Sequence, residues 1–344
     1  MTCSDNDTRD QACGVGTTAA MVAAARAVAT RRANPLIDDP YAEVLVRAAG
    51  VDLFARLASG TLEYEDVGPG WLPEYFAVRT RFFDDFLSQV MAGCVRQVAI
   101  VGSGLDARAY RLEWPEGTVI YEIDQPAVLE FKTVTLSSVG ATPGGELRTV
   151  GVDLRHDWPM ALRDVGFDPT RPTAWIAEGL MIGYLHGDEQ DRLLGQVTEL
   201  SAPGSRVAAD HLRADSTSIG SIIGNVAKAW KRNGFEVNFG NLTYPRDRSD
   251  AGNYLANRGW FVSGHTINDL LAAAEVSDTS LDTSPQLHGA IDYLTATKGE
   301  TAGDVLRPAD AFSIYSGTAD IATSLRRCQR PSRLPHRGRW DPLA

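Results

Sequence analysis

The residues best suited to chemistry in this chain are two closely spaced glycines and an acid that follows them. Gly102 and Gly104 end the apolar run 97–101, and Asp124 ends a second apolar run about 20 residues later. Glycines at a strand end let the backbone approach a ligand closely, and an acid at this distance receives ribose hydroxyls. The spacing therefore predicts a site for a nucleotide-bearing cofactor.

Each of these residues also has a purely structural interpretation. The glycines suit a tight strand-to-helix turn that binds nothing, and Asp124 suits the cap of a helix that begins at Gln125 and Pro126. Glu122 competes with Asp124 for the ribose, because strand alternation puts both on one face. Asp124 is nearer the end of the strand and is therefore the first choice.

Acids also close the next two predicted strands. Asp153 follows the run 147–152, and Glu178 ends the run 173–178. The carboxyl ends of parallel strands meet at the edge of the sheet where ligands bind. We therefore expect both acids to lie near Asp124 and to belong to the same site.

Strands and helices alternate through the middle of the chain. Apolar runs predict strands at 97–101, 118–123, 147–152, 173–178, 205–210 and 293–298. Helical patterns occupy 17–32, 41–49, 74–92, 106–111, 125–137, 187–200, 218–233 and 252–258. The alternation is typical of an α/β protein with a mostly parallel, doubly wound sheet.

The chain is expected to form a single domain, 14–298, between two disordered tails. In order, its parts are the N-terminus (1–13), a helical section (14–93), a cofactor-binding core (94–210), an inserted cap over the cofactor end of the sheet (211–259), closing strands (260–298) and the tail (299–344). The tail carries six arginines and no acid between Arg326 and Arg339. A non-catalytic extension is a commoner explanation for such a tail than nucleic-acid binding.

Composition narrows the classes of function. A net charge of −11 argues against a nucleic-acid-binding surface, and no apolar run approaches the roughly 18 residues of a membrane span. The four cysteines have no CxxC spacing, so reduced thiols are expected, with neither a zinc site nor a disulfide framework. The polar N-terminus lacks a secretory pattern. We therefore expect a cytoplasmic protein without a metal, nucleic-acid or membrane partner.

The order of these motifs resembles the leucine carboxyl methyltransferase superfamily, in its bacterial branch. The resemblance covers about residues 15–298 and rests on the motifs at 79–84 (RTRFFD), 101–108 (VGSGLDAR), 121–126 (YEIDQP), 151–154 (GVDL) and 177–180 (AEGL). It implies a Rossmann-like class I methyltransferase fold with S-adenosylmethionine as the cofactor.

The resemblance also implies roles for individual residues. These are Arg79 at the cofactor's methionine carboxylate, Gly102 and Gly104 against the cofactor, Asp124 at the ribose hydroxyls, Asp153 and Leu154 at the adenine, and Glu178 at the methionine end. A planar guanidinium suits bidentate binding of a carboxylate, and Arg81 is the rival position for this role.

The implied reaction is the in-line transfer of a methyl group to a carboxylate or hydroxyl oxygen of an unidentified acceptor. No catalytic residue is assigned. A hydroxyl acceptor would need a base, and His156, His186 and His211 lie near strand ends, although each is more often a structural residue.

Two other functions are compatible with the same residues. One is an NAD(P)-dependent oxidoreductase, because Gly102, Gly104 and Ala107 fit a relaxed dinucleotide fingerprint. The chain contains no Tyr-x-x-x-Lys pair, which a common class of such enzymes needs. The other is a protein that binds S-adenosylmethionine without catalysis.

Overall fold

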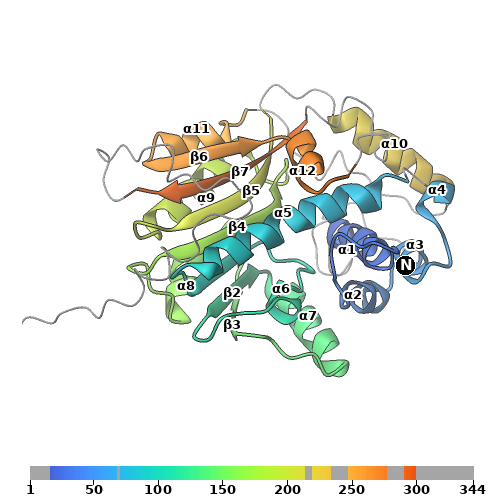
Figure 1. Ribbon diagram of the computed structural model, residues 1–344, viewed down its shortest axis with the longest axis horizontal. Helices are drawn as coiled ribbons and strands as arrows, with labels where there is room; N and C mark the ends of the chain where they lie inside the picture. Colours follow the sequence, from blue (N-terminus) through green and yellow to red (C-terminus); the bar gives the residue numbers. More distant parts are fainter. Residues whose placement is uncertain (1–15, 68–69, 214–218, 234–246, 277–289, 300–344) are drawn as a thin grey trace, which may run out of the picture.

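The described strands form one seven-stranded sheet in the order β3-β2-β1-β4-β5-β7-β6, in which β7 runs antiparallel to the other six strands. The computed structural model describes residues 16–67, 70–213, 219–233, 247–276 and 290–299 (Figure 1). The strands are β1 Gln97–Val101, β2 Val119–Asp124, β3 Glu146–Gly151, β4 Thr173–Met181, β5 Arg206–Leu212, β6 Trp260–His265 and β7 Ile291–Lys298. This arrangement confirms the predicted doubly wound, Rossmann-like α/β fold.

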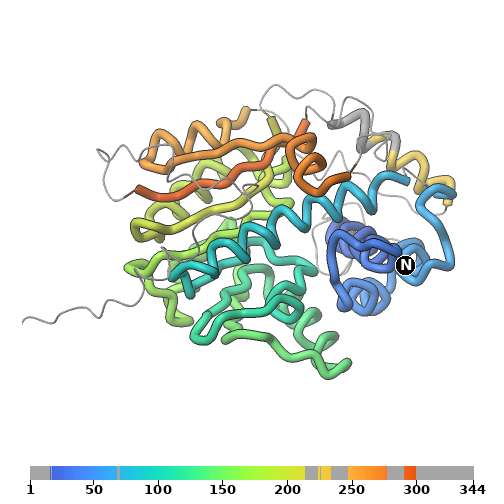
Figure 2. Tube along the Cα trace, viewed as in Figure 1, coloured from blue at the N-terminus to red at the C-terminus, as the bar shows by residue number. Residues whose placement is uncertain are grey.

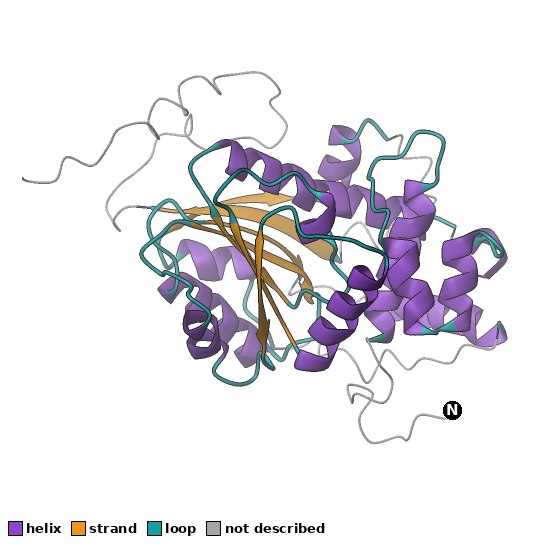
Figure 3. Cartoon of the chain, turned by 90° about the horizontal axis from the view of Figure 1, so that it is seen from below, coloured by secondary structure: helices purple, strands orange, loops and turns teal. Residues whose placement is uncertain are grey.

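Helices cover both faces of the sheet (Figure 3). They are α1 Thr17–Thr30, α2 Ala42–Ala49, α3 Asp52–Ser59, α4 Tyr64–Val67, α5 Leu72–Ala92, α6 Arg108–Arg111, α7 Pro126–Ser138, α8 Trp158–Asp164, α9 Gly187–Glu199, α10 Ile219–Arg232, α11 Ala251–Ala256 and α12 Ile267–Ala273. The long helix α5 leads from the N-terminal helices along the sheet towards β1 (Figure 2).

The central strands are buried on both faces, which explains why their sequences are uninterrupted apolar runs. Val98 and Ile100 of β1 pack into the cluster that contains α1 and α5, whereas Ala99 and Val101 pack into the cluster that contains α8 and α9. This two-sided burial fixes the strands rigidly, so the loops at their carboxyl ends are held on a stable base.

Four short helices were not predicted from the sequence: α3, α4, α8 and α12. None is longer than eight residues, so each has too few positions to show a helical period. The expectation that 260–275 returns to complete the sheet is confirmed for β6, which pairs with β7, whereas the rest of this range forms α12. Its start is set by a capping box in which Thr266 and Asp269 bind each other's backbone amides.

The two helices of the expected cap, α10 and α11, pack in different places. Trp230 of α10 is buried and meets Phe54 of α3 edge to face, with ring centroids 5.3 Å apart. Helix α11 instead packs on β6 and α9. Residues 234–246, between them, lie outside the described residues.

Two expectations drawn from composition concern the described residues directly. None of the described helices combines the length and apolarity that a membrane crossing requires. Cys94 is the one cysteine among the described residues, so the expectation of reduced thiols, which also concerns the other three cysteines, stays a prediction.

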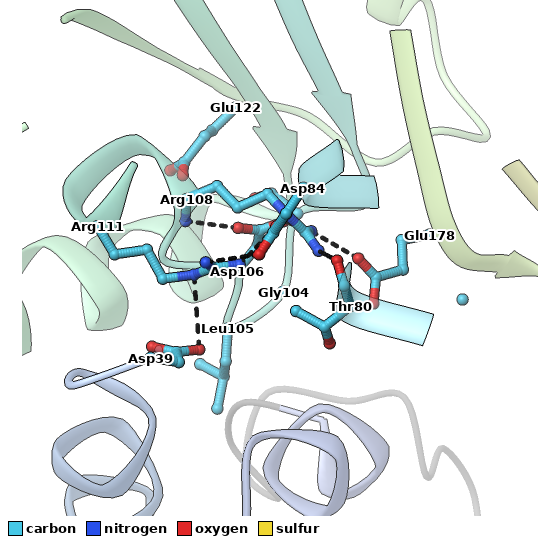
Figure 4. Close-up of polar contacts among 12 residues, drawn as sticks. Asp39, Thr80, Asp84, Gly104, Leu105, Asp106, Arg108, Arg111, Glu122 and Glu178 are labelled. Atoms are coloured by element: carbon cyan, nitrogen blue, oxygen red, sulfur yellow. Dashed lines mark hydrogen bonds and ion pairs between the residues drawn. The ribbon is translucent and has the colours of Figure 1, made fainter. Parts of the chain in front are cut away.

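Arg108 is the centre of a buried charge cluster at the carboxyl edge of the sheet (Figure 4). Its guanidinium lies 2.6 Å from Asp84 of α5, 2.6 Å from Asp106 of the loop after β1 and 2.5 Å from Glu178 of β4. It also donates to the carbonyl of Thr80 at 3.2 Å. One side chain therefore joins α5, the glycine loop and β4.

The cluster extends to the N-terminal helices. Arg111 of α6 lies 2.7 Å from Asp84 and 3.9 Å from Asp39, which precedes α2. Arg26 of α1 binds Asp39 at 2.8 Å and donates to the carbonyl of Leu105 at 2.7 Å. The N-terminal helices are thus fixed to the same loop as the sheet.

Replacing Arg108 by methionine should destabilise the protein by about 3–5 kcal/mol, because three carboxylates whose side chains are only 10–15% exposed lose their shared counter-ion. Equilibrium denaturation at pH 7.5 measures the loss in the free energy of unfolding. Arg81→Met is the matched control, on α5, the helix that carries Asp84. Arg81 and its partner Asp85 are each 41% exposed and 3.5 Å apart, so this change should cost less than about 1 kcal/mol.

The destabilisation by Arg108→Met should shrink as the pH falls from 7.5 to 5. Burial alone would raise the pKa of Asp106, but Arg108, Lys132 and Arg111 together lower it to about 2. Without Arg108, burial dominates and the folded-state pKa rises, so proton uptake favours the folded variant as the pH decreases. If the loss in the free energy of unfolding stays constant with pH, the pKa of Asp106 does not depend on Arg108.

Candidate cofactor-binding and active site

Both glycines of the loop after β1 have backbone angles that favour glycine. The angle φ is +66° at Gly102 and +44° at Gly104, and a Cβ on Gly102 would lie 3.3 Å from Leu180. The amides of Gly102 and Ser103 donate to the carbonyl of Ile123, at 2.9 and 3.2 Å. Helix α6 has only four residues, so the loop itself, rather than a long helix N-terminus, forms this wall of the site.

Asp124 lies beside this loop at the end of β2. Its Oδ2 accepts a hydrogen bond from the amide of Gly104, and its Oδ1 accepts one from the amide of Gln125, both at 2.7 Å. Burial raises the pKa of Asp124, although these two hydrogen bonds oppose the rise. Each carboxylate oxygen has a further lone pair, so the structural role at Gln125 leaves capacity for a ligand.

Glu122, the alternative to Asp124, is fully buried and faces a different partner. Its Oε2 lies 2.9 Å from Nζ of Lys132 on α7, and that lysine is also fully buried. In Figure 4, Glu122 stands apart from the carboxylates gathered around Arg108. Asp124, and not Glu122, therefore accepts a hydrogen bond from the glycine loop.

Asp153 and Leu154 follow β3, next to the end of β2. The amide of Val152 donates to the carbonyl of Asp124 at 2.9 Å, which holds the two strand ends together. Asp153 is 2.5 Å from Arg155, and hydrogen bonds from Arg155 lower the pKa of Asp153 to about 2. Leu154 is partly buried and packs on the cluster beneath.

Arg79 projects from α5 to the ends of β4 and β5. Its Nε donates to Asp210 Oδ2 at 2.8 Å, and its Nη1 lies 3.7 Å from Glu178 Oε1. Among the described hydrogen bonds it uses only one of its five donors, although its side chain is only 3% exposed. Arg81, the rival position, is 41% exposed and pairs with Asp85.

Asp210 is a site residue that the sequence analysis missed. It ends the apolar part of β5, so the same pattern that selected Glu178 would have selected it. Its Oδ1 accepts a hydrogen bond from the amide of Gly179 at 2.6 Å. Gly179 has a φ of +71°, and a Cβ there would lie 2.7 Å from Nη2 of Arg79. Glycine is therefore needed beside this arginine.

A cavity of about 190 Å³ lies between α1, α5 and the ends of β1 and β4. Its charged lining comes from Arg26, Arg79, Asp106 and Glu178, together with the glycine loop. The remaining lining is mostly apolar. It includes Ala19, Met21, Val22, Phe76, Ile100, Val101, Leu105, Gly179 and Ile182, with the hydroxyl residues Thr18 and Tyr184. Asp124, Asp153 and Leu154 lie outside this lining.

The contribution of α1 to the cavity was also missed, because its Ala-rich sequence indicates a helix without indicating what the helix covers. Tyr184, in the loop after β4, is a further addition, and burial raises its pKa. None of the three candidate histidines belongs to the described lining. His156 and His186 are exposed, and His211 is buried in β5.

Comparison with known proteins identifies relatives over most of the chain. A relative from Mycolicibacterium gilvum is 53% identical over 281 residues, which is 78% of this chain and 91% of its own length. One from Mycobacterium marinum is 51% identical over 81% of this chain and 90% of its own length. Both are named "Putative S-adenosyl-L-methionine-dependent methyltransferase".

Among solved structures, a "putative methyltransferase" from Thermobifida fusca superposes on this chain with a TM-score of 0.46 and 17% identity. The match covers 81% of this chain and 94% of the other. The model of the leucine carboxyl methyltransferase family matches residues 19–198, just over half of the chain. Together with the two mycobacterial relatives, this match shows that the chain belongs to the leucine carboxyl methyltransferase family.

Proposed function

We propose that the protein transfers the methyl group of S-adenosylmethionine to a carboxylate oxygen of an acceptor molecule. The observation that carries the proposal is the glycine-walled cavity at the carboxyl edge of the sheet, with Arg79 and Glu178 on one side of it. Membership of the leucine carboxyl methyltransferase family supports methyl transfer as the reaction and argues against the alternative of an NAD(P)-dependent oxidoreductase. The relatives' names support the choice of cofactor.

The charges around the cavity fit the methionine end of this cofactor, which carries both a carboxylate and an ammonium group. Arg79 has guanidinium donors beyond the one that Asp210 accepts, and these suit the carboxylate. Glu178 supplies negative charge on the same side. Since Arg79 and Glu178 line one cavity, both ends of this zwitterion find a partner there.

The nucleoside part of the cofactor fits the neighbouring strand ends. Asp124 keeps free lone pairs for ribose hydroxyls while it holds the amide of Gly104. Leu154 offers an apolar surface to the adenine. Asp153 would have to share its carboxylate between the adenine amine and Arg155, because that ion pair is already formed.

When bound, the cofactor supplies an electrophilic methyl group on a positively charged sulfur. The chain's own contribution is orientation and the exclusion of water, for which the side chains of Met21, Phe76 and Ile182 provide an apolar wall. Arg79 is kept in place by Asp210, because a paired guanidinium cannot swing into the cavity freely.

The protonation states favour a carboxylate acceptor over a hydroxyl. A hydroxyl needs a base, but no histidine lines the described cavity, and Asp106 has a pKa of about 2. The pKa of Tyr184 is raised by burial, so its hydroxyl stays protonated and serves as a hydrogen-bond donor. A carboxylate is already ionised at neutral pH and needs no base.

Asp124→Ala should weaken the binding of S-adenosylhomocysteine, the demethylated cofactor, by about 1.5–3 kcal/mol, because ribose hydroxyls lose a charged acceptor. Titration calorimetry measures the dissociation constant, and thermal denaturation confirms that the variant is folded. Asp164→Ala, at an exposed position at the end of α8, is the matched control and should bind as the wild type does. Equal affinity in both variants would remove Asp124 from the ribose site.

Incubation with methyl-labelled S-adenosylmethionine and a panel of carboxylic acids and phenols tests the reaction itself. We expect label on a carboxylic acid, in a product from which mild alkali releases methanol, because methyl esters hydrolyse and methyl ethers do not. Label that resists alkali would identify a hydroxyl acceptor instead. Tight cofactor binding without transfer to the panel or to any molecule of a cell extract would leave a non-catalytic binding protein.

A further inference from the structure

Lys132 of α7 is a fully buried lysine whose charged end lies behind the glycine loop. Its Nζ is 2.9 Å from Glu122 Oε2 and donates to the carbonyl of Asp106 at 2.9 Å and to Ser103 Oγ at 3.3 Å. The ammonium group of Lys132 thus combines an ion pair with two hydrogen bonds. Two of the partners belong to the loop.

Stability alone does not account for this arrangement. Taking a lysine and a glutamate out of water is costly, and apolar side chains of similar size often replace a buried ion pair without loss of stability. Burial raises the pKa of Glu122, which reflects that cost. The pair makes directional contacts that can hold the loop in one conformation, and apolar side chains could not make these contacts.

The partners of Lys132 bracket the part of the loop that faces the ligand. Ser103 and Asp106 lie on either side of Gly104, whose amide is bound by Asp124. The amide of Asp106 also donates a hydrogen bond to the carbonyl of Ser103, at 2.8 Å. With its carbonyl held by Lys132, Asp106 directs its carboxylate to Arg108 and the cavity.

We propose that Lys132 and Glu122 form a positioning pair that holds the loop from Ser103 to Asp106 in the conformation that receives the cofactor. The proposal rests on the proposed function for the identity of that cofactor. The loop conformation itself is independent of it. Lys132 acts through the loop and does not line the cavity.

The double variant Glu122→Met/Lys132→Met tests the proposal, because it removes both charges together and leaves neither unpaired. We expect a thermal midpoint close to that of the wild type. In the cofactor-free protein, amide hydrogen exchange in the peptide 102–107 should be faster than in the wild type, while exchange in the rest of the sheet stays unchanged. The dissociation constant for S-adenosylhomocysteine should rise about tenfold or more.

Lys298→Met is the matched control. Lys298 Nζ donates to the carbonyls of Thr198 and Ser201, at 2.6 and 2.7 Å, near the start of β5 and therefore at the opposite edge of the sheet. This variant should lose some stability but keep the wild-type dissociation constant and the wild-type exchange in 102–107. If the double variant does not fold, Glu122→Gln, which keeps the shape and removes the charge, is measured in its place.

Wild-type exchange in 102–107 together with wild-type affinity in the double variant would overturn the proposal. An equal rise in exchange over the whole sheet would also overturn it, because it would show a general loss of stability. If the wild type does not bind S-adenosylhomocysteine, the proposed function fails. Exchange in the cofactor-free loop then still decides whether the pair positions it.

Discussion

A buried guanidinium among three carboxylates is the interaction on which the rest of this site depends. Arg108 binds Asp84, Asp106 and Glu178, which come from a helix, the glycine loop and a strand end. Largely buried carboxylates so close together need a shared counter-ion. Because Arg108 neutralises all three carboxylates, it also fixes the relative positions of the three elements that carry them and surround the cavity.

The same principle organises the two sides of the site. At the ends of β4 and β5, Asp210 holds Arg79 while leaving guanidinium donors available to a ligand. Behind the loop, Glu122 and Lys132 form a separate buried pair. The polar groups are thus oriented by the protein before any cofactor arrives, and such preorganisation reduces the reorganisation that binding and reaction require.

The sequence predicted what depends on local pattern and missed what depends on distant contacts. The strand β1 was predicted with its observed bounds, because burial on both faces leaves an apolar run that only a central strand explains. The short helices α3 and α8 were missed, because seven or eight residues do not establish a period. Lys132 was missed because its partners in the loop, Ser103 and Asp106, are 29 and 26 residues away in the sequence. Asp210 was overlooked, although it ends a strand as Glu178 does.

A crystal structure of the complex with S-adenosylhomocysteine tests the central claim most directly, namely that the cavity at the carboxyl edge of the sheet is the cofactor site. The account predicts the amino-acid carboxylate of the ligand within hydrogen-bonding distance of Arg79 and its ribose hydroxyls at Asp124. The amide of Gly104 should still be bound to Asp124, as it is without ligand. A ligand bound elsewhere, or one that reaches neither Arg79 nor Asp124, would contradict the account.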